Sequence, residues 1–164
     1  MDAPQQITPT KLADYLEAIS KPIFETGMSW KIIEAKWPGF QVAFHAFDPE
    51  RVANLSPDEV DALTADTRII RNRRKIEATV ANAATMIALE QQHGSFGAYL
   101  TSLGGFEAQH KDLKKRFKGL GDFGAYYFLY VVGQPVPEHH EFREKMLEGG
   151  SKLREPAAQR LTKG

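Results

Sequence analysis

The chain has 164 residues, of which 42% are hydrophobic and 26% are charged, and it has no cysteine. This length and composition predict a single globular domain, and the missing cysteines exclude disulfide bonds, thiol catalysis and thiolate metal ligands. A formal net charge of zero argues against a strongly basic protein that coats nucleic acid. No apolar run approaches the roughly 18 residues that span a membrane, and the start shows no secretion signal, so we expect a cytoplasmic protein without a membrane partner.

Apolar residues recur at helical spacing along the chain, and almost no stretch alternates as a strand would, so we predict an all-α fold. Prolines and glycines divide the first part of the chain into helices or helical turns, expected over residues 10–20, 22–36 and 40–47. The second of these has Gly27 in its middle. The run Ser56-Pro57-Asp58-Glu59 has the hydroxyl, proline and glutamate of a complete capping box, which makes it the strongest helix start in the sequence.

The second part of the chain predicts one long helix followed by shorter ones. The long helix is expected to end near Gln92, with Gly94 as its stop, and Ser95 is expected to cap the next helix. Residues 1–148 are therefore predicted to form one helical domain, and residues 149–164 a polar tail with no apolar repeat.

A glycine-rich turn between two helices is the stretch around which the chain is organised. A basic helix over residues 111–117 is followed by Gly119, Leu120 and Gly121, and then by an apolar helix over residues 123–132. The glycines allow unusual backbone angles and close contact, while the leucine holds the turn in the core. We interpret this as a helix-hairpin-helix motif, with Asp122 as cap of the second helix; the alternative is an ordinary turn between two helices.

Although the net charge is zero, basic residues are concentrated in two clusters along the chain. Residues 68–75 hold five basic side chains and no acidic one, and residues 111–118 hold five against one acid. Backbone N–H groups at a helix start bind phosphate, so the hairpin with Lys118 is a candidate DNA-binding site, with Arg71 and Arg73 as further phosphate contacts. The alternative for the two arginines is a solvated helix start.

Three runs in order, at residues 26–30, 44–49 and 69–76, together resemble the bacterial DNA-3-methyladenine glycosylase I family of the helix-hairpin-helix DNA glycosylase superfamily. The resemblance covers residues 12–106 and 113–139, roughly three quarters of the chain. It implies an all-helical enzyme that flips an alkylated base out of double-stranded DNA and hydrolyses its glycosidic bond. No cofactor and no protein partner are expected.

The chain departs from the family pattern in two places. Family members hold zinc through cysteine and histidine, and this chain has no cysteine, so we expect no metal. His139 and His140 are adjacent and diverge on a helix, which makes a substitute metal site unfavourable. The family also has a base-binding glutamate eight residues before its stacking tryptophan, where this chain has Pro22 before Trp30.

The chemistry of the substrate decides which pocket residues matter. A 3-methyladenine base is cationic while attached to its sugar, so it attracts an indole face by about 0.5–2 kcal/mol and favours a nearby carboxylate. Trp30 is therefore the candidate for stacking and Glu25 for the catalytic carboxylate. The alternatives are a core tryptophan and a solvated helix carboxylate.

Other candidate site residues come from the resemblance and from the helix after the hairpin. Met28, beside Gly27, matches the place where the family inserts a residue into the gap left by the flipped nucleotide. Tyr126 and Tyr127 are candidates for further walls of the base pocket. For Met28 and the tyrosines the alternative is core packing. The alternative for the protein is a non-catalytic DNA-binding or damage-sensing relative that has lost the family's pocket glutamate.

Overall fold

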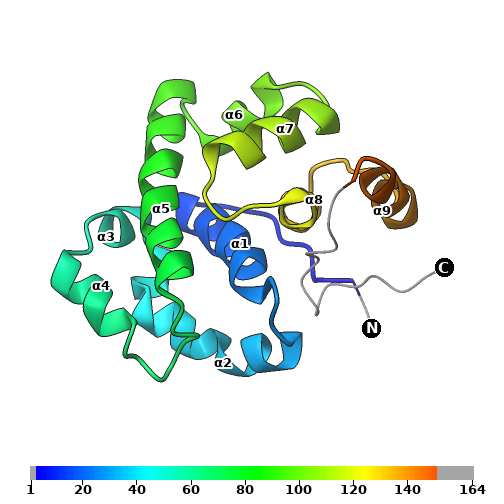
Figure 1. Cartoon of the computed structure of the whole chain (residues 1–164). Coiled ribbons are helices and arrows are strands. Elements are labelled where there is room, and N and C mark those ends of the chain that lie inside the picture. The colour runs from blue at the N-terminus through cyan, green and yellow to red at the C-terminus, as the bar shows by residue number, and fades with distance from the viewer. Residues whose placement is uncertain (1–2, 151–164) are drawn as a thin grey trace.

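The computed structural model describes residues 3–150, which contain α-helices and one short 3-10 turn but no β-strand (Figure 1). The predicted all-α fold is confirmed for this part of the chain. Most of the predicted tail, residues 151–164, lies outside the described residues. The helices are α1 (Leu12–Glu25), α2 (Trp30–Ala43), α3 (Pro49–Ala53), α4 (Pro57–Leu63), α5 (Arg73–His93), α6 (Phe96–Ser102), α7 (Phe106–Arg116), α8 (Asp122–Val131) and α9 (His139–Glu148), with the 3-10 turn η1 (His45–Phe47) between α2 and α3.

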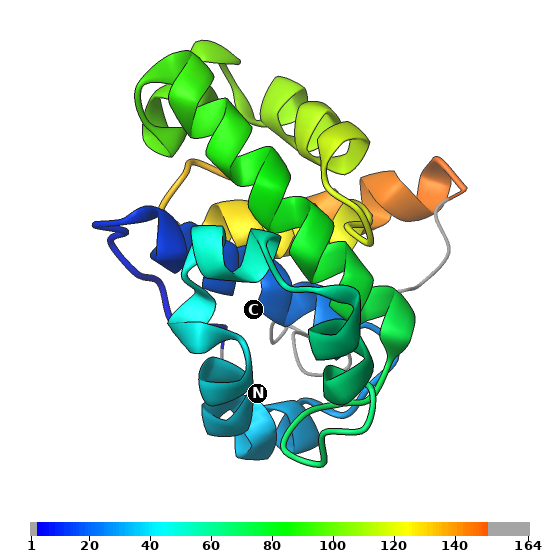
Figure 2. The same cartoon turned by 90° about the vertical axis from the view of Figure 1, so that its left-hand side faces the viewer.

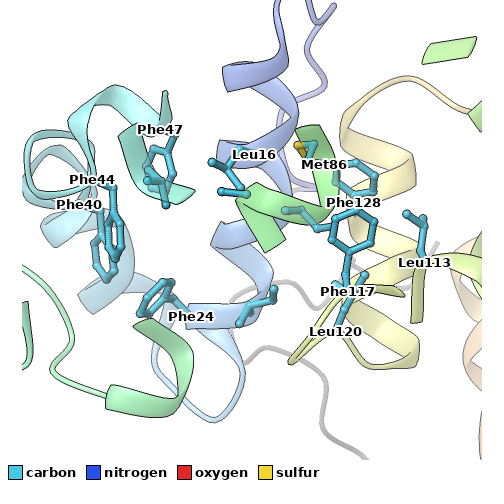
Figure 3. Packing of buried hydrophobic residues seen from close by; sticks show 14 of the residues in the cluster. Leu16, Phe24, Phe40, Phe44, Phe47, Met86, Leu113, Phe117, Leu120 and Phe128 are labelled. Carbon is cyan, nitrogen blue, oxygen red and sulfur yellow. The ribbon is translucent and has the colours of Figure 1, made fainter. Parts of the chain in front are cut away.

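Helix α5 is the long element against which the others are arranged. Figure 1 shows α3 and α4 beside its lower half and α6 and α7 near its upper end, and Figure 2 shows the same arrangement from the side. Helix α1 packs against both α5 and α8 and runs through the middle of the core. Figure 3 shows the rings of Phe40 and Phe44 on one side of α1 and those of Phe117 and Phe128 on the other. All four rings are buried.

The boundary between α1 and α2 is not where proline and glycine signals placed it. Helix α1 continues through Pro22 to Glu25, and the break falls at Gly27, which has a φ of 78°. A proline inside a helix removes one hydrogen bond, here the one that would reach the carbonyl of Ala18. Burial of Ile19, Ile23 and other residues on this helix outweighs that loss. The predicted helix start at residue 22 was wrong.

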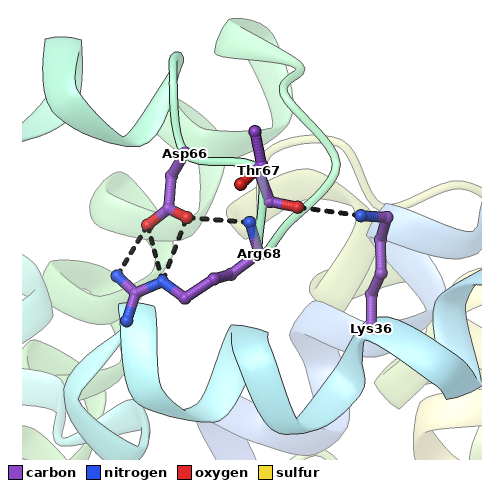
Figure 4. Close-up of polar contacts among 4 residues, drawn as sticks. All are labelled: Lys36, Asp66, Thr67 and Arg68. Carbon is purple, nitrogen blue, oxygen red and sulfur yellow. Dashed lines mark hydrogen bonds and ion pairs between the residues drawn. The ribbon is translucent and has the colours of Figure 1, made fainter.

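Helix α2 likewise runs through Pro38 and Gly39, where the sequence predicted its end. The glycine is required by packing, since a Cβ atom there would lie 2.4 Å from the carbonyl oxygen of Arg68. The loop that carries this carbonyl is fixed by side chains (Figure 4). Lys36 donates to the carbonyl of Thr67 at 2.9 Å, and the Asp66 carboxylate accepts from the guanidinium and backbone N–H of Arg68.

Residues 40–47, predicted as a short helix or helical turn, form the end of α2 and the 3-10 turn η1, whose backbone is left-handed. His45, Ala46 and Phe47 have φ values of 56°, 55° and 56°. Left-handed backbone costs non-glycine residues about 1–2 kcal/mol each. Aromatic packing offsets this cost, because the ring of Phe47 stacks at 5.5 Å on both Phe44 and Trp37.

Candidate active site and DNA-binding groove

A cavity of about 730 Å³ lies between the facing sides of α1 and α2. Glu17, Lys21 and Glu25 follow one another at four-residue intervals on α1, so all three reach the same side of that helix. On α2, Trp30 and Trp37 are seven residues apart, which is about two turns, and both line the cavity. Regular helical spacing thus directs two tryptophans and several charged groups into one space.

The structure brings Glu25 and Trp30 together as lining residues of this cavity. Glu25 is only 1% exposed, so it is not the solvated helix carboxylate that was the alternative for this residue. Trp30 begins α2 and is half-buried, so its indole is accessible from the cavity. Pro22 lies in the wall as well and contributes an apolar surface there.

The two tyrosines of α8 have different places. Tyr127 lines the cavity, and its hydroxyl lies 2.9 Å from Nε2 of His139. Tyr126 is not among the lining residues: its hydroxyl donates to the carbonyl of Pro137 at 2.7 Å, and its ring stacks on Phe142 at 4.6 Å. Burial raises the pKa of Tyr126 to about 12. Tyr126 is therefore a packing residue at the junction of α8 and α9, and not a pocket wall.

Trp37 is a lining residue that the sequence interpretation missed. It is 7% exposed, and its indole N–H donates to Oε2 of Glu17 at 2.8 Å. The same carboxylate oxygen accepts from Nε2 of Gln41 at 2.8 Å, so it is held by two donors from α2. The signal that could have found Trp37 is its two-turn spacing from Trp30.

The segment before α1 forms another wall of the cavity. The backbone N–H of Ile7 donates to the carbonyl of Val131 at 2.8 Å, and the side chain of Gln6 donates to the carbonyl of Tyr130 at 2.9 Å. These bonds fix the segment to the end of α8, and residues 3–5, 7 and 8 line the cavity.

The charge of the cavity favours a cationic ligand. Four of its lining side chains are acidic, Asp14, Glu17, Glu25 and Glu34, and Lys21 is the single basic one among the described residues. Carboxylates only accept hydrogen bonds, and their summed field attracts positive charge into a space with apolar walls.

A second concavity, a groove of about 1120 Å³, is formed by the hairpin, α5 and the end of α1. Gly119 has a φ of 79°, which favours glycine, and a Cβ atom there would lie in tight contact, 3.2 Å from Cγ2 of Ile23. Leu120 is 7% exposed and holds the turn in the core, as predicted. Gly121 is the N-cap of α8, whereas Asp122 is its first residue and pairs with Lys114.

Buried Asn82 of α5 fixes the hairpin. Its Oδ1 accepts from the backbone N–H of Lys118 at 2.8 Å, and its Nδ2 donates to the carbonyl of the same residue at 3.0 Å. Both backbone groups at the turn are thus satisfied by a side chain that is 1% exposed. The side chain of Lys118 lines the groove together with Lys115 and Arg74.

Lys75 connects α5 with the end of α1. Its ammonium donates to the carbonyls of Phe24 and Thr26 at 3.0 and 2.7 Å, and burial lowers the pKa of this lysine. The two carbonyls flank Glu25 in the chain, and the turn after them carries Gly27 and Met28. The side chain of Met28 is half-buried and packs against the core.

The predicted arginine contacts lie at the edge of this region. Arg71 is exposed, while Arg73 pairs with Asp61 at 2.5 Å and with Glu77 at 3.7 Å. Neither arginine is among the residues that line the groove, where Arg74 stands instead.

Neither a metal cluster nor a membrane-spanning helix is found in the described residues. Within residues 3–150 no group of three or more His, Cys, Asp or Glu side chains is placed to hold a metal ion. None of the helices in the same range is long and apolar enough to cross a membrane.

Comparison with known proteins identifies the family. The model of the methyladenine glycosylase family matches residues 13–123. DNA-3-methyladenine glycosylase 1 of Escherichia coli (strain K12) is 31% identical over 146 residues, which cover 71% of this chain and 78% of that protein. A solved structure of 3-methyladenine DNA glycosylase I from Staphylococcus aureus has 26% sequence identity and a TM-score of 0.70, covering 80% of this chain and 81% of that one.

A further structure, that of a single-residue variant of 3-methyladenine DNA glycosylase I in complex with 3-methyladenine, also has 26% identity and a TM-score of 0.70, covering 80% of this chain and 82% of that one. The family model, the relatives and the all-α fold place the chain in the class of helical DNA glycosylases. Within that class, the chain belongs to the methyladenine glycosylase family.

Proposed function

We propose that the protein is a DNA repair glycosylase that hydrolyses the N-glycosidic bond of alkylated purines, with 3-methyladenine as substrate, in double-stranded DNA. Membership in the methyladenine glycosylase family supports the reaction class. The observation that carries the proposal in this chain is the cavity that Glu25 and Trp30 line together. The reaction takes place in the cytoplasm and needs no cofactor.

The leaving base supplies much of its own activation. Alkylation at a ring nitrogen makes the base cationic, so breaking its bond to C1′ sends the electron pair to the base and neutralises that charge. Water adds to C1′ and loses a proton. The protein therefore has to bind the cationic base selectively and to stabilise positive charge as it develops on the sugar.

Trp30 and Glu25 meet these two needs. The indole of Trp30 offers a π face on which the flipped base stacks, and a cation strengthens this contact. The buried carboxylate of Glu25 attracts the same cation and, as the bond breaks, stabilises the sugar cation. Tyr127 bounds the cavity from α8.

The groove and the turn between α1 and α2 contact the duplex in this proposal. Backbone N–H groups of Gly119 and Gly121 and the side chain of Lys118 hold phosphates, with Arg71 and Arg73 beyond them. Met28 then enters the space that the flipped nucleotide leaves, and Gly27 gives its turn the backbone angle it needs.

Base release by the wild-type protein tests the function. Duplex DNA treated with a methylating agent should release 3-methyladenine above the spontaneous rate, whereas duplex that contains uracil should release nothing, because a neutral base lacks leaving-group activation. Chromatography of the freed bases measures both. If no 3-methyladenine is released, the proposed enzymatic function is wrong, and the alternative, a non-catalytic DNA-binding protein, is favoured.

Lys118→Ala tests the phosphate contact at the hairpin. The variant should bind all duplex sequences more weakly, and the slope of log K against log salt should fall by about one unit, because one fewer phosphate is neutralised. Titrations at several salt concentrations measure this slope. Lys31→Ala removes an exposed lysine of α2, away from the groove, and should leave the slope as in wild type. An unaltered slope in Lys118→Ala would show that the hairpin is structural only.

A further inference from the structure

An internal cation already lies on one of the cavity's two indoles. The ammonium of Lys21 is 5.4 Å from the centroid of the Trp37 ring, and it lies 2.5 Å from Oε1 of Glu34. All three residues line the cavity that holds Glu25 and Trp30. An aromatic face with a carboxylate beside it is the usual surrounding of a bound organic cation.

Trp37 is held rigidly in the position this contact requires. Its ring stacks on Phe40 at 4.8 Å and on Phe47 at 5.5 Å. Its indole N–H donates to the Glu17 carboxylate, and an anionic acceptor increases the electron density that the ring presents to a cation. The indole face of Trp37 is therefore fixed in position before a ligand binds, whereas the cation that lies on it can be exchanged.

Lys21, in contrast, is held loosely. Its side chain is 29% exposed and that of Glu34 is 47% exposed, and ion pairs with this much solvent contact are weak. The lysine stem is long and flexible, so the ammonium can move into solvent without disturbing α1.

We propose that Trp37 and Glu34 form a second cation site within the cavity, that Lys21 occupies it in the free protein, and that a cationic base displaces Lys21 from it. This inference rests on the proposed function for the identity of the base, a purine that alkylation has made positively charged. A neutral purine that enters the cavity breaks the contacts of Lys21 and replaces neither of them. Lys21 thus lowers the affinity of the cavity for every base by the same factor, and because Trp37 and Glu34 attract a cation and not a neutral base, an undamaged base does not displace it.

The same exchange also favours departure of the product. Once the glycosidic bond is broken, the base has received the bonding electrons and no longer carries the charge that displaced Lys21. The ammonium of Lys21 then forms its contacts with Trp37 and Glu34 again, and the affinity of the cavity for the neutral base falls.

Binding of a stable cationic nucleoside tests the proposal without any bond being broken. The probe is 1-methyladenosine, which is cationic at neutral pH, and adenosine is its neutral counterpart. Trp30 and Trp37 are the only tryptophans of the chain, and both line the cavity, so quenching of intrinsic fluorescence reports its occupancy. Wild type should bind 1-methyladenosine in preference to adenosine. Lys21→Ala should bind 1-methyladenosine about tenfold more tightly, since the internal competitor is gone.

Two variants make the result specific. Lys21→Arg keeps a cation over Trp37 and should retain the wild-type affinity, while Lys31→Ala removes a neighbouring exposed charge outside the cavity and should change affinity by less than about twofold. Unchanged or weaker binding of 1-methyladenosine to Lys21→Ala would overturn the proposal. Failure of the wild type to release 3-methyladenine from DNA would instead count against the proposed function, so the two failures are distinguishable.

Discussion

Trp30→Ala is expected to reduce the release of 3-methyladenine from alkylated duplex by about a hundredfold or more, to near the spontaneous rate. The substitution removes a stacking surface worth about 1–3 kcal/mol and a cation–aromatic contact worth about 0.5–2 kcal/mol. Each 1.4 kcal/mol is about a tenfold change in rate. Single-turnover release, followed by chromatography of the free base, measures the effect.

Folding and chemistry can be separated for this variant. Trp30 is half-buried at the first position of α2, so helical content and the midpoint of thermal unfolding should stay close to those of wild type. Trp30→Phe keeps a flat aromatic face with a weaker attraction for cations and should fall between wild type and Trp30→Ala. If Trp30→Ala released the base at the wild-type rate, the indole of Trp30 would have no role in catalysis.

Glu25→Gln should lose base release by about two to three orders of magnitude while retaining affinity for duplex that contains an abasic site. The amide keeps the size of the side chain but removes the negative charge that stabilises the developing cation, and loss of one such electrostatic group costs this much in other enzymes. Release rates and abasic-site affinity, measured on the same preparation, separate chemistry from binding.

The matched control for Glu25 is a carboxylate away from the cavity. Glu90→Gln on α5 makes the same chemical change outside the lining residues and should release base as wild type does. Release by Glu25→Gln at the wild-type rate would show that Glu25 is not the catalytic carboxylate. Loss of abasic-site binding together with release would indicate a structural role.

Local signals in the sequence were sufficient where a few adjacent residues decide the structure. The capping box at Ser56 to Glu59 forms as predicted, and Gly94 ends α5 with a φ of 89°. The same kind of signal failed at Pro22, because one lost hydrogen bond was outweighed by burial of the helix against residues distant in sequence. Proline rules are local, and the position of this break was decided by tertiary packing.

The site was predictable only in part, for a related reason. Chemistry and resemblance led to Trp30 and Glu25, which the structure places in one cavity. Tyr126 and Tyr127 are adjacent, so they point about 100° apart on α8, and sequence alone did not show which one faces the cavity. Asn82 was missed because its partner, the backbone of Lys118, is 36 residues away. A contact between residues so far apart in the sequence cannot be predicted from a local sequence pattern.

Two side chains of α5 together set a fixed distance in this protein. Lys75 holds the turn beside Glu25, and Asn82 holds the hairpin at Lys118, about 10 Å further along the same helix. The interval between the proposed phosphate contacts at the hairpin and the cavity lined by Glu25 is therefore fixed by the rigid helix α5. When the protein meets a duplex, the distortion needed to span this interval falls on the DNA. Lesions that weaken stacking are then extracted most easily, since they lower the cost of bending and unpairing at that point.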